Sequence, residues 1–396
     1  MATKNNIPAG YKNSAVGIIP QEWKVKRLGA CFSIGHGRDY KHLSNGDIPV
    51  YGSGGIICYV GSFLHDGETV CIGRKGTINK PFYYNGPIWT VDTLFYTHSF
   101  QSVLPRYVGY LFDSIDWMRY NEATGVPSLT AKTISNIKKA MPPMEEQRKI
   151  AEILGVWDEA IEKQGRLIEK LELRKRALMQ HLLTGRTRLP GFTTPWQKVK
   201  LGEIGKTYNG LTGKSKEDFE DGNAKFIPYI NVFSNEKVNI DKLGVVSVDE
   251  SEKQNKVQYG DIFFTVSSET PDEVGMASVL LDEIENTYLN SFCFGYRLND
   301  FEILNPIFAS YILRGDRFRN YMMVLSQGST RFNISKNEVM KLKIELPSLH
   351  EQKAIAEVLT TADDEIATNR KKLDALRLQK RGLMQQLLTG KARVKI

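Results

Sequence analysis

The residues best suited to bind a polyanion form a short run between two glycines, Gly73–Arg74–Lys75–Gly76. An arginine can donate two hydrogen bonds to one guanine, and a lysine is a good phosphate anchor. Glycines on both sides would let the backbone approach a ligand closely. We therefore expect this loop to contact nucleic acid, although a solvated surface charge is the alternative for any single lysine or arginine.

Other basic and polar residues occupy turn-rich stretches in two separate segments of the chain. We predict that the loops carrying these residues form two DNA-binding surfaces. The candidates in the first segment are Arg38, Lys41, Tyr51, Ser53, Arg74 and Lys75. The candidates in the second segment are Lys214, Lys216, Tyr229, Asn231, Ser267, Ser268, Glu269, Thr270, Arg331 and Asn333.

Motifs that would carry catalysis are incomplete. Asn305–Pro306–Ile307–Phe308 is similar to the N-P-P-[YF] motif of amino-methyltransferases, but isoleucine replaces the second proline and no cofactor loop precedes it, so a helix start is expected. Gly52–Ser53–Gly54–Gly55 lacks the full spacing of a phosphate-binding loop. Pro271–Asp272 is not followed by the rest of a nuclease motif, and no two histidines have metal-ligand spacing. We predict no catalytic residue and no metal site.

The composition fits a soluble protein with a polyanionic partner. Lys and Arg outnumber Asp and Glu by 53 to 45 in 396 residues, which gives a net charge of +8. The four cysteines, Cys31, Cys58, Cys71 and Cys293, form no C-x-x-C pair, which argues against a zinc site. No stretch approaches the roughly 18 consecutive apolar residues of a membrane span. A cytoplasmic location is expected.

The chain contains one segment twice. Residues from Pro142 to Arg188 correspond without a gap to residues from Pro347 to Arg393, at an offset of 205 positions. A second correspondence, of Trp23 with Trp196, has an offset of 173 positions, so the second intervening segment is longer by 32 residues. The order globule, helix, globule, helix is typical of two modules that vary independently on a shared scaffold.

Both repeated segments have the apolar spacing of a coiled coil, with alternating steps of four and three residues. Gln164 and Lys175 interrupt the first stripe, and Asn369 and Lys380 interrupt the second. Two separate amphipathic helices, each packed on its own globule, are the alternative. The predicted seam residues are Ile150, Leu154, Trp157, Ile161, Ile168, Leu171, Leu178, Leu182, Ile355, Leu359, Ala362, Ile366, Leu373, Leu376, Leu383 and Leu387.

The ends of these helices carry capping signals. Ser348 followed by Glu351 has capping-box spacing. Gly185 and Gly390 stand where a left-handed cap would end each helix.

The two globular segments show short strand patterns bounded by Gly-, Asn- and Pro-rich turns, followed by a helical stretch, so we expect α+β domains. The predicted strands are 47–61, 68–77 and 90–98 in the first segment and 225–233, 260–268 and 291–298 in the second. The predicted helices are 106–120 and 306–323.

The runs "IPVYGSGG" (48–55) and "GDIFFTVSSETPDEVGMASV" (260–279), together with the doubled "EQ…IAE…L…LLTG" helices, closely resemble the specificity subunits of Type I restriction–modification systems. The resemblance covers nearly the whole chain. It implies two target recognition domains separated by a long antiparallel two-helix coiled coil with pseudo-two-fold symmetry. The corresponding parts are an N-terminal arm (1–19), a first recognition domain (20–142), a first spacer helix (143–190), a second recognition domain (191–347) and a second spacer helix (348–396).

The resemblance also implies a non-catalytic subunit that binds double-stranded DNA at a two-part target. It would dock two methyltransferase subunits, which recruit restriction subunits. S-adenosylmethionine, ATP and Mg²⁺ are then expected in the partner subunits, and no cofactor is expected in this chain. Two alternatives stay open: a nucleic-acid-modifying enzyme with an unrecognised active site, and a coiled-coil interaction protein without a DNA role.

Overall fold

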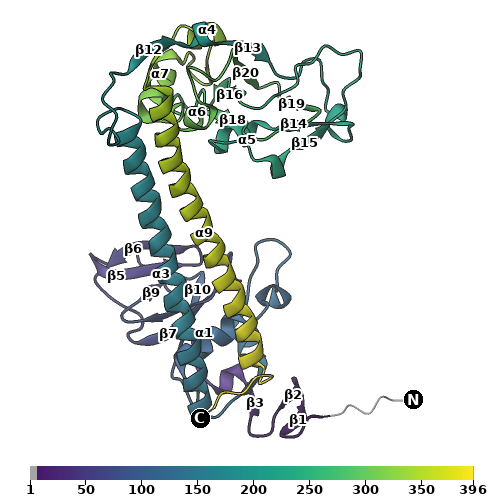
Figure 1. The fold of residues 1–396 in the computed structure, drawn as a ribbon. Helices are drawn as coiled ribbons and strands as arrows, with labels where there is room; N and C mark the ends of the chain where they lie inside the picture. The colour runs from purple at the N-terminus through teal and green to yellow at the C-terminus, as the bar shows by residue number, and fades with distance from the viewer. Residues whose placement is uncertain (1–6, 396) are drawn as a thin grey trace. The chain divides into compact units, whose positions relative to one another are not determined.

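A computed structural model describes residues 7–395, and its element order is drawn in Figure 1. The chain forms two compact units. Unit 1 contains the residues up to Arg166 and those from Lys371 onward, and unit 2 is Leu167–Arg370. Each unit therefore combines one globular part with a portion of both long helices. Met1–Asn6 of the predicted arm and Ile396 lie outside the described residues.

The globular part of unit 1 has two main sheets. An antiparallel sheet has the strand order β4-β10-β7-β8, and a second sheet has the order β6-β5-β9, in which β5 pairs antiparallel with β6 and parallel with β9. The elements are β1 (Tyr11–Ser14), β2 (Gly17–Pro20), β3 (Lys24–Arg27), η1 (Leu28–Ala30), β4 (Ser33–His36), β5 (Asn45–Gly52), β6 (Gly55–Val60), β7 (Glu68–Gly73), β8 (Phe82–Asn85), β9 (Trp89–Thr90), β10 (Leu94–His98), α1 (Pro105–Asp113), η2 (Trp117–Tyr120), α2 (Ala131–Asn136) and β11 (Lys138–Met141).

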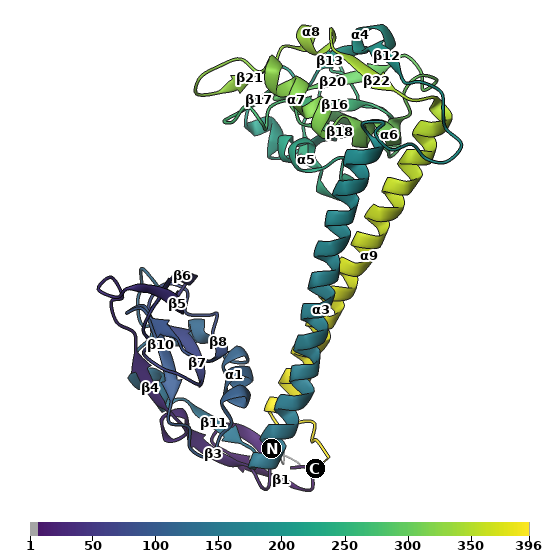
Figure 2. The ribbon, with the colours of Figure 1, turned by 90° about the vertical axis from the view of Figure 1, so that its left-hand side faces the viewer.

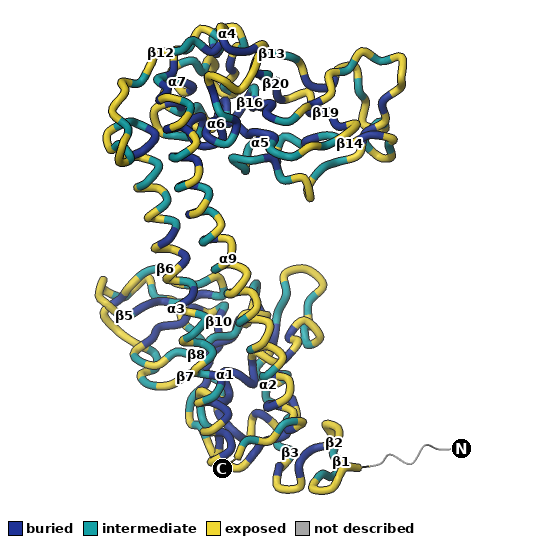
Figure 3. The backbone as a smooth tube through the Cα atoms, viewed as in Figure 1, coloured by how far each residue is buried: buried dark blue, intermediate teal, exposed yellow. Residues whose placement is uncertain are grey.

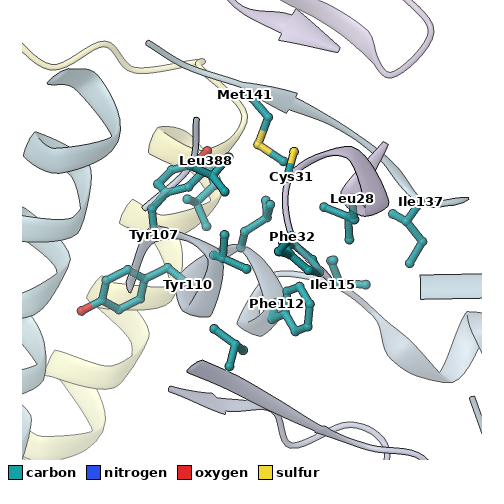
Figure 4. Packing of buried hydrophobic residues seen from close by; sticks show 14 of the residues in the cluster. Leu28, Cys31, Phe32, Tyr107, Tyr110, Phe112, Ile115, Ile137, Met141 and Leu388 are labelled. Atoms are coloured by element: carbon teal, nitrogen blue, oxygen red, sulfur yellow. The ribbon is translucent and has the colours of Figure 1, made fainter. Parts of the chain in front are cut away.

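Helix α1 covers one side of the antiparallel sheet, where it contacts β7 and β8 (Figure 2). This explains why β7 reads as an almost continuous apolar run, because every residue after Glu68 is buried. Figure 4 shows α1 side chains such as Tyr107 packed among Cys31, Phe32 and Leu388. Leu388 comes from the second long helix, so the core of unit 1 includes residues from a distant part of the sequence.

Unit 2 repeats this plan. Its antiparallel sheet has the order β13-β20-β16-β18, and its second sheet has the order β15-β14-β19, with one antiparallel and one parallel pairing. The elements are β12 (Gln197–Lys200), α4 (Leu201–Ile204), β13 (Gly205–Asn209), η3 (Glu217–Phe219), β14 (Ala224–Ile227), α5 (Tyr229–Ser234), η4 (Ile240–Lys242), β15 (Gly244–Val246), β16 (Ile262–Thr265), β17 (Ser267–Ser268), β18 (Ala277–Val279), β19 (Thr287–Leu289), β20 (Cys293–Leu298), α6 (Pro306–Ile312), α7 (Asp316–Leu325), β21 (Phe332–Asn333), α8 (Lys336–Val339) and β22 (Lys343–Leu346).

The predicted strand 225–233 is wrong in its second half. Strand β14 ends at Ile227, and Pro228 then leads into the short helix α5. Proline has no backbone N–H to continue a ladder. The guanidinium of Arg314 stabilises the end of α5 by donating to the carbonyl oxygens of Val232, Phe233 and Asn235. Arg314 lies 79 to 82 positions away in the sequence, so no local pattern indicated this contact.

The predicted helices 106–120 and 306–323 are both interrupted. The first consists of α1 and the separate short helix η2, and the second consists of α6 and α7. The start of α6 confirms the interpretation of the Asn305–Pro306 motif. The Asn305 side chain accepts from the N–H of Phe308 at 3.0 Å, and Pro306 takes the first helical position.

The long helices are α3 (Met144–Leu182) and α9 (Leu349–Leu388). Every predicted seam residue is buried or half-buried, and Figure 3 shows buried positions recurring along each helix between exposed ones. Glu351 N–H donates to the Ser348 hydroxyl at 3.3 Å, which is half of the predicted capping box. Gly185 and Gly390 have φ of +69° and +73°, as their predicted role as caps requires. Among residues 7–395, no helix combines the length and apolarity needed to cross a membrane.

Candidate nucleic-acid interface

In unit 1 the Arg74–Lys75 turn is held by backbone hydrogen bonds while both side chains are exposed. The N–H of Arg74 donates to Thr93 O at 2.8 Å, and its carbonyl accepts from Leu129 N–H at 2.9 Å. Gly76 needs its φ of +90°, and a side chain at Gly73 would collide with the backbone of Thr77. The glycines therefore serve the tight turn, which presents two cations on a fixed backbone.

The other candidates of unit 1 lie around this turn. The Ser53 hydroxyl stands against Gly76, so the tip of the β5–β6 hairpin adjoins the basic turn. Arg38 is exposed. Its N–H donates to Thr90 O at 2.8 Å, and its carbonyl oxygen accepts from the indole N–H of Trp89 at 3.0 Å. Lys41 follows in the same exposed segment.

Tyr51 has a packing role that its sequence context did not show. Its ring lies 4.9 Å from that of Phe82 and 5.7 Å from that of Tyr84, and burial raises the pKa of its hydroxyl. These contacts account for an aromatic residue at this position without any base contact.

In unit 2 most candidates gather where β17 pairs with β21. This pairing aligns Ser267 with Asn333 and Ser268 with Phe332, and the Tyr229 hydroxyl donates to Ser267 O at 2.9 Å. The exposed residues of this region are Glu269, Thr270, Arg331 and Asn333. The two serines and Tyr229 therefore support the surface that these residues present.

Arg319 of α7 anchors the loop that follows β17. Its guanidinium donates to Asp272 O at 2.8 Å, to Val274 O at 2.6 Å and to Gly275 O at 2.8 Å. Three carbonyl acceptors on one planar group fix the backbone beyond Thr270. The sequence analysis missed Arg319, because a contact across 44 to 47 positions has no local pattern.

Three further candidates of unit 2 lie elsewhere. Lys214 is nearly buried and forms an ion pair with Glu252 at 2.5 Å, and Asn231 is buried and donates to Asn239 O and Lys242 O. These partners account for both residue types without DNA. Lys216 is exposed next to this loop.

A cleft of about 660 Å³ connects these two groups of loops in unit 2. Thr212 and Lys214 line one side, and Ser335 and Lys336 line the other. The Lys336 ammonium donates to the side-chain oxygen of Asn209. The sequence analysis missed Asn209 at the end of β13, Thr212 in the loop that follows and Lys336 at the start of α8, because none of them belongs to a distinctive motif. The lining combines polar and cationic groups such as Thr212, Ser335 and Lys336 with apolar side chains such as Leu211 and Phe294, a mixture that can contact a phosphate and a base.

The helix starts carry a matched set of contacts in the two units. Gln147 accepts from Leu104 N–H at 2.9 Å and donates to Pro142 O, and Gln352 accepts from Asn305 N–H at 2.9 Å and donates to Pro347 O. Both glutamines are buried, so each ties the start of a long helix to the start of the domain helix α1 or α6.

The neighbouring glutamates also match. Glu146 is buried and accepts from Arg393 at 2.8 Å, and Glu351 is buried and accepts from Arg188 at 2.5 Å. Glu146 also accepts from the indole N–H of Trp23 at 2.8 Å. The indole N–H of the matching Trp196 finds no acceptor among the described residues.

No group of three or more His, Cys, Asp and Glu side chains within residues 7–395 could hold a metal ion. Cys31, Cys71 and Cys293 are buried, and Cys58 is half-buried. Burial raises the pKa of the Cys293 thiol to about 12, which disfavours its reactive thiolate form.

Two globular α+β parts with one strand order, each built on portions of the same pair of helices, define a class of proteins with an internally repeated modular fold. The family model described as the Type I restriction modification DNA specificity domain matches residues 20–173 and 193–378. The chain belongs to this family, which confirms the resemblance found in the sequence.

Individual relatives of the chain are also named specificity subunits. The MjaVIII Type I restriction enzyme specificity subunit of Methanocaldococcus jannaschii is 29% identical over 286 residues, which are 69% of this chain and 66% of the relative. The putative MjaX specificity subunit of the same organism is 28% identical over 320 residues, which are 74% of this chain and 69% of the relative. The chain thus spans about two thirds of the length of these relatives.

Solved structures show the same fold. The S subunit of a Type I system from M. genitalium aligns over 98% of both chains with a TM-score of 0.59 and 15% identity. A chain from a structure concerned with assembly and conformational transition of the type I R-M system aligns with a TM-score of 0.60 and 16% identity, over 94% of this chain and 99% of the other.

Proposed function

We propose that this chain is the DNA-reading subunit of a Type I restriction–modification complex and that it has no active site of its own. Each globular part reads one half of a two-part target. One contrast carries the proposal. The sheets and the helix contacts are repeated in the two units, whereas the loops that hold the candidate DNA residues differ. The predicted domain boundaries and the sixteen DNA candidates are part of this proposal.

We further propose that α3 and α9 form an antiparallel coiled coil that relates the two halves by a pseudo-two-fold axis. Within unit 1, Lys380 of α9 pairs with Asp158 of α3, and within unit 2, Arg370 of α9 pairs with Glu172 of α3. As the position along α3 rises from 158 to 172, the position of the partner along α9 falls from 380 to 370. They support an antiparallel arrangement over independent packing of each helix on its own domain.

Methyltransferase subunits, two by symmetry, would dock on this helix pair and recruit the restriction subunits. S-adenosylmethionine, ATP and Mg²⁺ would then act in those partners. Leu173 and Leu378 support a doubled docking site, because they occupy matching positions of the repeat and are 62% and 68% exposed. A partner that covers these two leucines would remove their apolar surface from water.

The test is adenine methylation in cells that express the chain with its methyltransferase subunits. Sequencing of the methylated sites should give one motif with two defined parts and a fixed gap. Adding one heptad to each long helix keeps the seams in phase and lengthens each by roughly 10 Å, so the gap should grow by about three base pairs. The added length also turns the DNA by roughly 100°, so weaker methylation is expected.

Three results would contradict the proposal. Turnover of DNA by the pure chain would show an enzyme, and absence of salt-dependent DNA binding would show an interaction protein without a DNA role. Methylation at the original gap by an assembled, lengthened complex would exclude the helices as the ruler.

A further inference from the structure

Asp363 joins three elements of unit 2 at one carboxylate. Its Oδ1 accepts from Lys175 of α3 at 2.7 Å, and its Oδ2 accepts from the hydroxyl of Tyr311 of α6 at 2.6 Å. Asp363 itself belongs to α9. The domain helix and both long helices therefore meet at this side chain, and we call the Tyr311–Asp363–Lys175 group the unit 2 node.

Unit 1 contains the same arrangement. Asp158 of α3 accepts from Lys380 of α9 at 2.5 Å through Oδ1 and from the hydroxyl of Tyr110 of α1 at 2.5 Å through Oδ2. The Asp and Lys positions are related by the 205-residue offset of the repeat. We call the Tyr110–Asp158–Lys380 group the unit 1 node.

Both nodes are sheltered on the tyrosine and lysine side, while the carboxylates of Asp158 and Asp363 remain 36% and 27% exposed. Tyr110 is 5% exposed and Tyr311 is fully buried, and the lysine side chains are 15% and 14% exposed. Burial, and then the hydrogen bond to aspartate, raises the pKa of both tyrosines, so both hydroxyls stay protonated donors. Charge-assisted hydrogen bonds of this kind are short and directional, whereas apolar packing between helices is not.

We propose that Asp158 and Asp363 are positioning residues that fix how each recognition domain is oriented on the helix pair. The inference rests on the proposed function, because its consequence concerns the gap between half-sites. Gln147 and Gln352 hold only the starts of α1 and α6, so a domain without its node could rock about that attachment, and the complex would then accept gaps one base pair longer or shorter. The nodes restrict that motion and thereby the accepted gap.

The two nodes differ in their surroundings. In unit 2, Lys175 also binds Glu236 at 2.9 Å, and Lys237 donates to the Tyr311 hydroxyl at 2.8 Å. In unit 1 the additional charge is Arg106, whose guanidinium lies 3.9 Å from Asp158. The unit 2 node is the more highly connected, so losing one bond should loosen unit 1 more than unit 2.

The experiment uses the complete methyltransferase complex and DNA duplexes that carry both half-sites at the native gap or at a gap one base pair shorter or longer. Tyr110→Phe and Tyr311→Phe remove only a hydroxyl. Lys175→Met and Lys380→Met remove the ion pair that joins one long helix to the other. Lys163→Met is the matched control, because it removes an exposed ion pair with Glu159 within one helix.

The ratio of methylation at the altered gaps to that at the native gap should rise about tenfold in the node variants and stay unchanged in Lys163→Met. The rise should be larger for Tyr110→Phe than for Tyr311→Phe, and the half-site bases should not change. Lys175→Arg and Lys380→Arg, which keep a cation, should restore the wild-type ratio.

An equal loss of methylation at every gap, with a lower melting temperature, would show a merely structural role and overturn the inference. An unchanged ratio in both tyrosine variants would do the same, even if a lysine variant fails to fold. If the wild-type complex methylates no two-part duplex, the proposed function itself fails and the inference fails with it.

Discussion

Units 1 and 2 share their sheets and their attachment to the helices but differ in their loops. Both have a four-stranded antiparallel sheet and a three-stranded mixed sheet in the same connection order. Both units also use the same three contacts to the long helices. A buried glutamine binds a backbone N–H, a buried glutamate binds an arginine, and an aspartate binds a tyrosine hydroxyl. These contacts preserve the attachment while the rest of the domain changes.

The differences concentrate between equivalent strands. Strands β5 and β6 are joined by a tight turn at Ser53–Gly54, whereas α5 and η4 intervene between β14 and β15. Unit 2 also has the β17–β21 pair and the full helix α7, where unit 1 has only the short η2. Additions of this kind alter the presented surface while the glutamine, glutamate and aspartate contacts are kept, and the segment between α5 and η4 adds Glu236 and Lys237 to the unit 2 node. Under the proposed function, half-site specificity could then change while the main attachment to the helices is preserved.

Replacing the second domain with the first is the strongest test of this comparison. In this chimera residues 23–142 replace residues 196–347. The inserted segment carries its own Trp23, the backbone N–H of Leu104 that binds a glutamine, and Tyr110, so it can make the contacts to the long helices that the second domain makes. The resulting complex should methylate an inverted repeat of the first half-site, as sequencing of methylated DNA would reveal. A chimera that assembles yet reads an unrelated first half-site would refute modularity.

The exposed leucines test whether both units dock a partner in the same way. Leu173→Asp or Leu378→Asp should remove one methyltransferase subunit from the complex, because a buried carboxylate at the interface is costly. The double variant should bind none, as native mass spectrometry would show. Loss of both partners from either single variant would mean that the two sites are not equivalent.

Basic residues in the two recognition surfaces should differ in effect. Arg74→Ala with Lys75→Ala removes a possible base contact and a phosphate contact, so affinity for target DNA should fall about 10- to 100-fold. Lys336→Met removes one cation from the unit 2 cleft. It should mainly make the slope of log affinity against log salt concentration shallower, by about one. Titrations at several salt concentrations would measure both, and unchanged affinity in the double variant would exclude the Arg74–Lys75 turn.

Glu146 and Glu351 offer the finest distinction between the units. Glu146→Ala would leave the buried Trp23 indole without its acceptor and Arg393 with Glu22, whereas Glu351→Ala would leave Arg188 with the carbonyl oxygen of Thr194. We expect the first to lower the free energy of unfolding of unit 1 by about 1–3 kcal/mol and the second to cost unit 2 less. Urea unfolding followed by tryptophan fluorescence would measure this order, and equal losses would show that the indole bond contributes little.

The helices and their repeat could be predicted because identical spacing recurs at one offset, and heptad patterns depend on local sequence. The roles of Lys175 and Lys380 could not be predicted. A lysine in an apolar stripe only interrupts the pattern until the aspartate with which it pairs is known. A matched Asp158 and Asp363 at the same offset was the available signal. Likewise, Lys214 resembled a free cation because the ion pair with Glu252 depends on a loop 38 positions away.

The core of unit 1 includes Met384, Leu387 and Leu388, and the Tyr11 hydroxyl donates to Gly390 O across 379 positions. Unit 2 closes its core with residues between Leu178 and Leu359, which include only the first turns of α9. During synthesis, the unit begun first must therefore wait for the last turns of α9 before its core is complete, while the unit begun later can close once the first turns are made. Until then the surface of unit 1 that receives these three residues stays uncovered, a natural substrate for a chaperone on the ribosome.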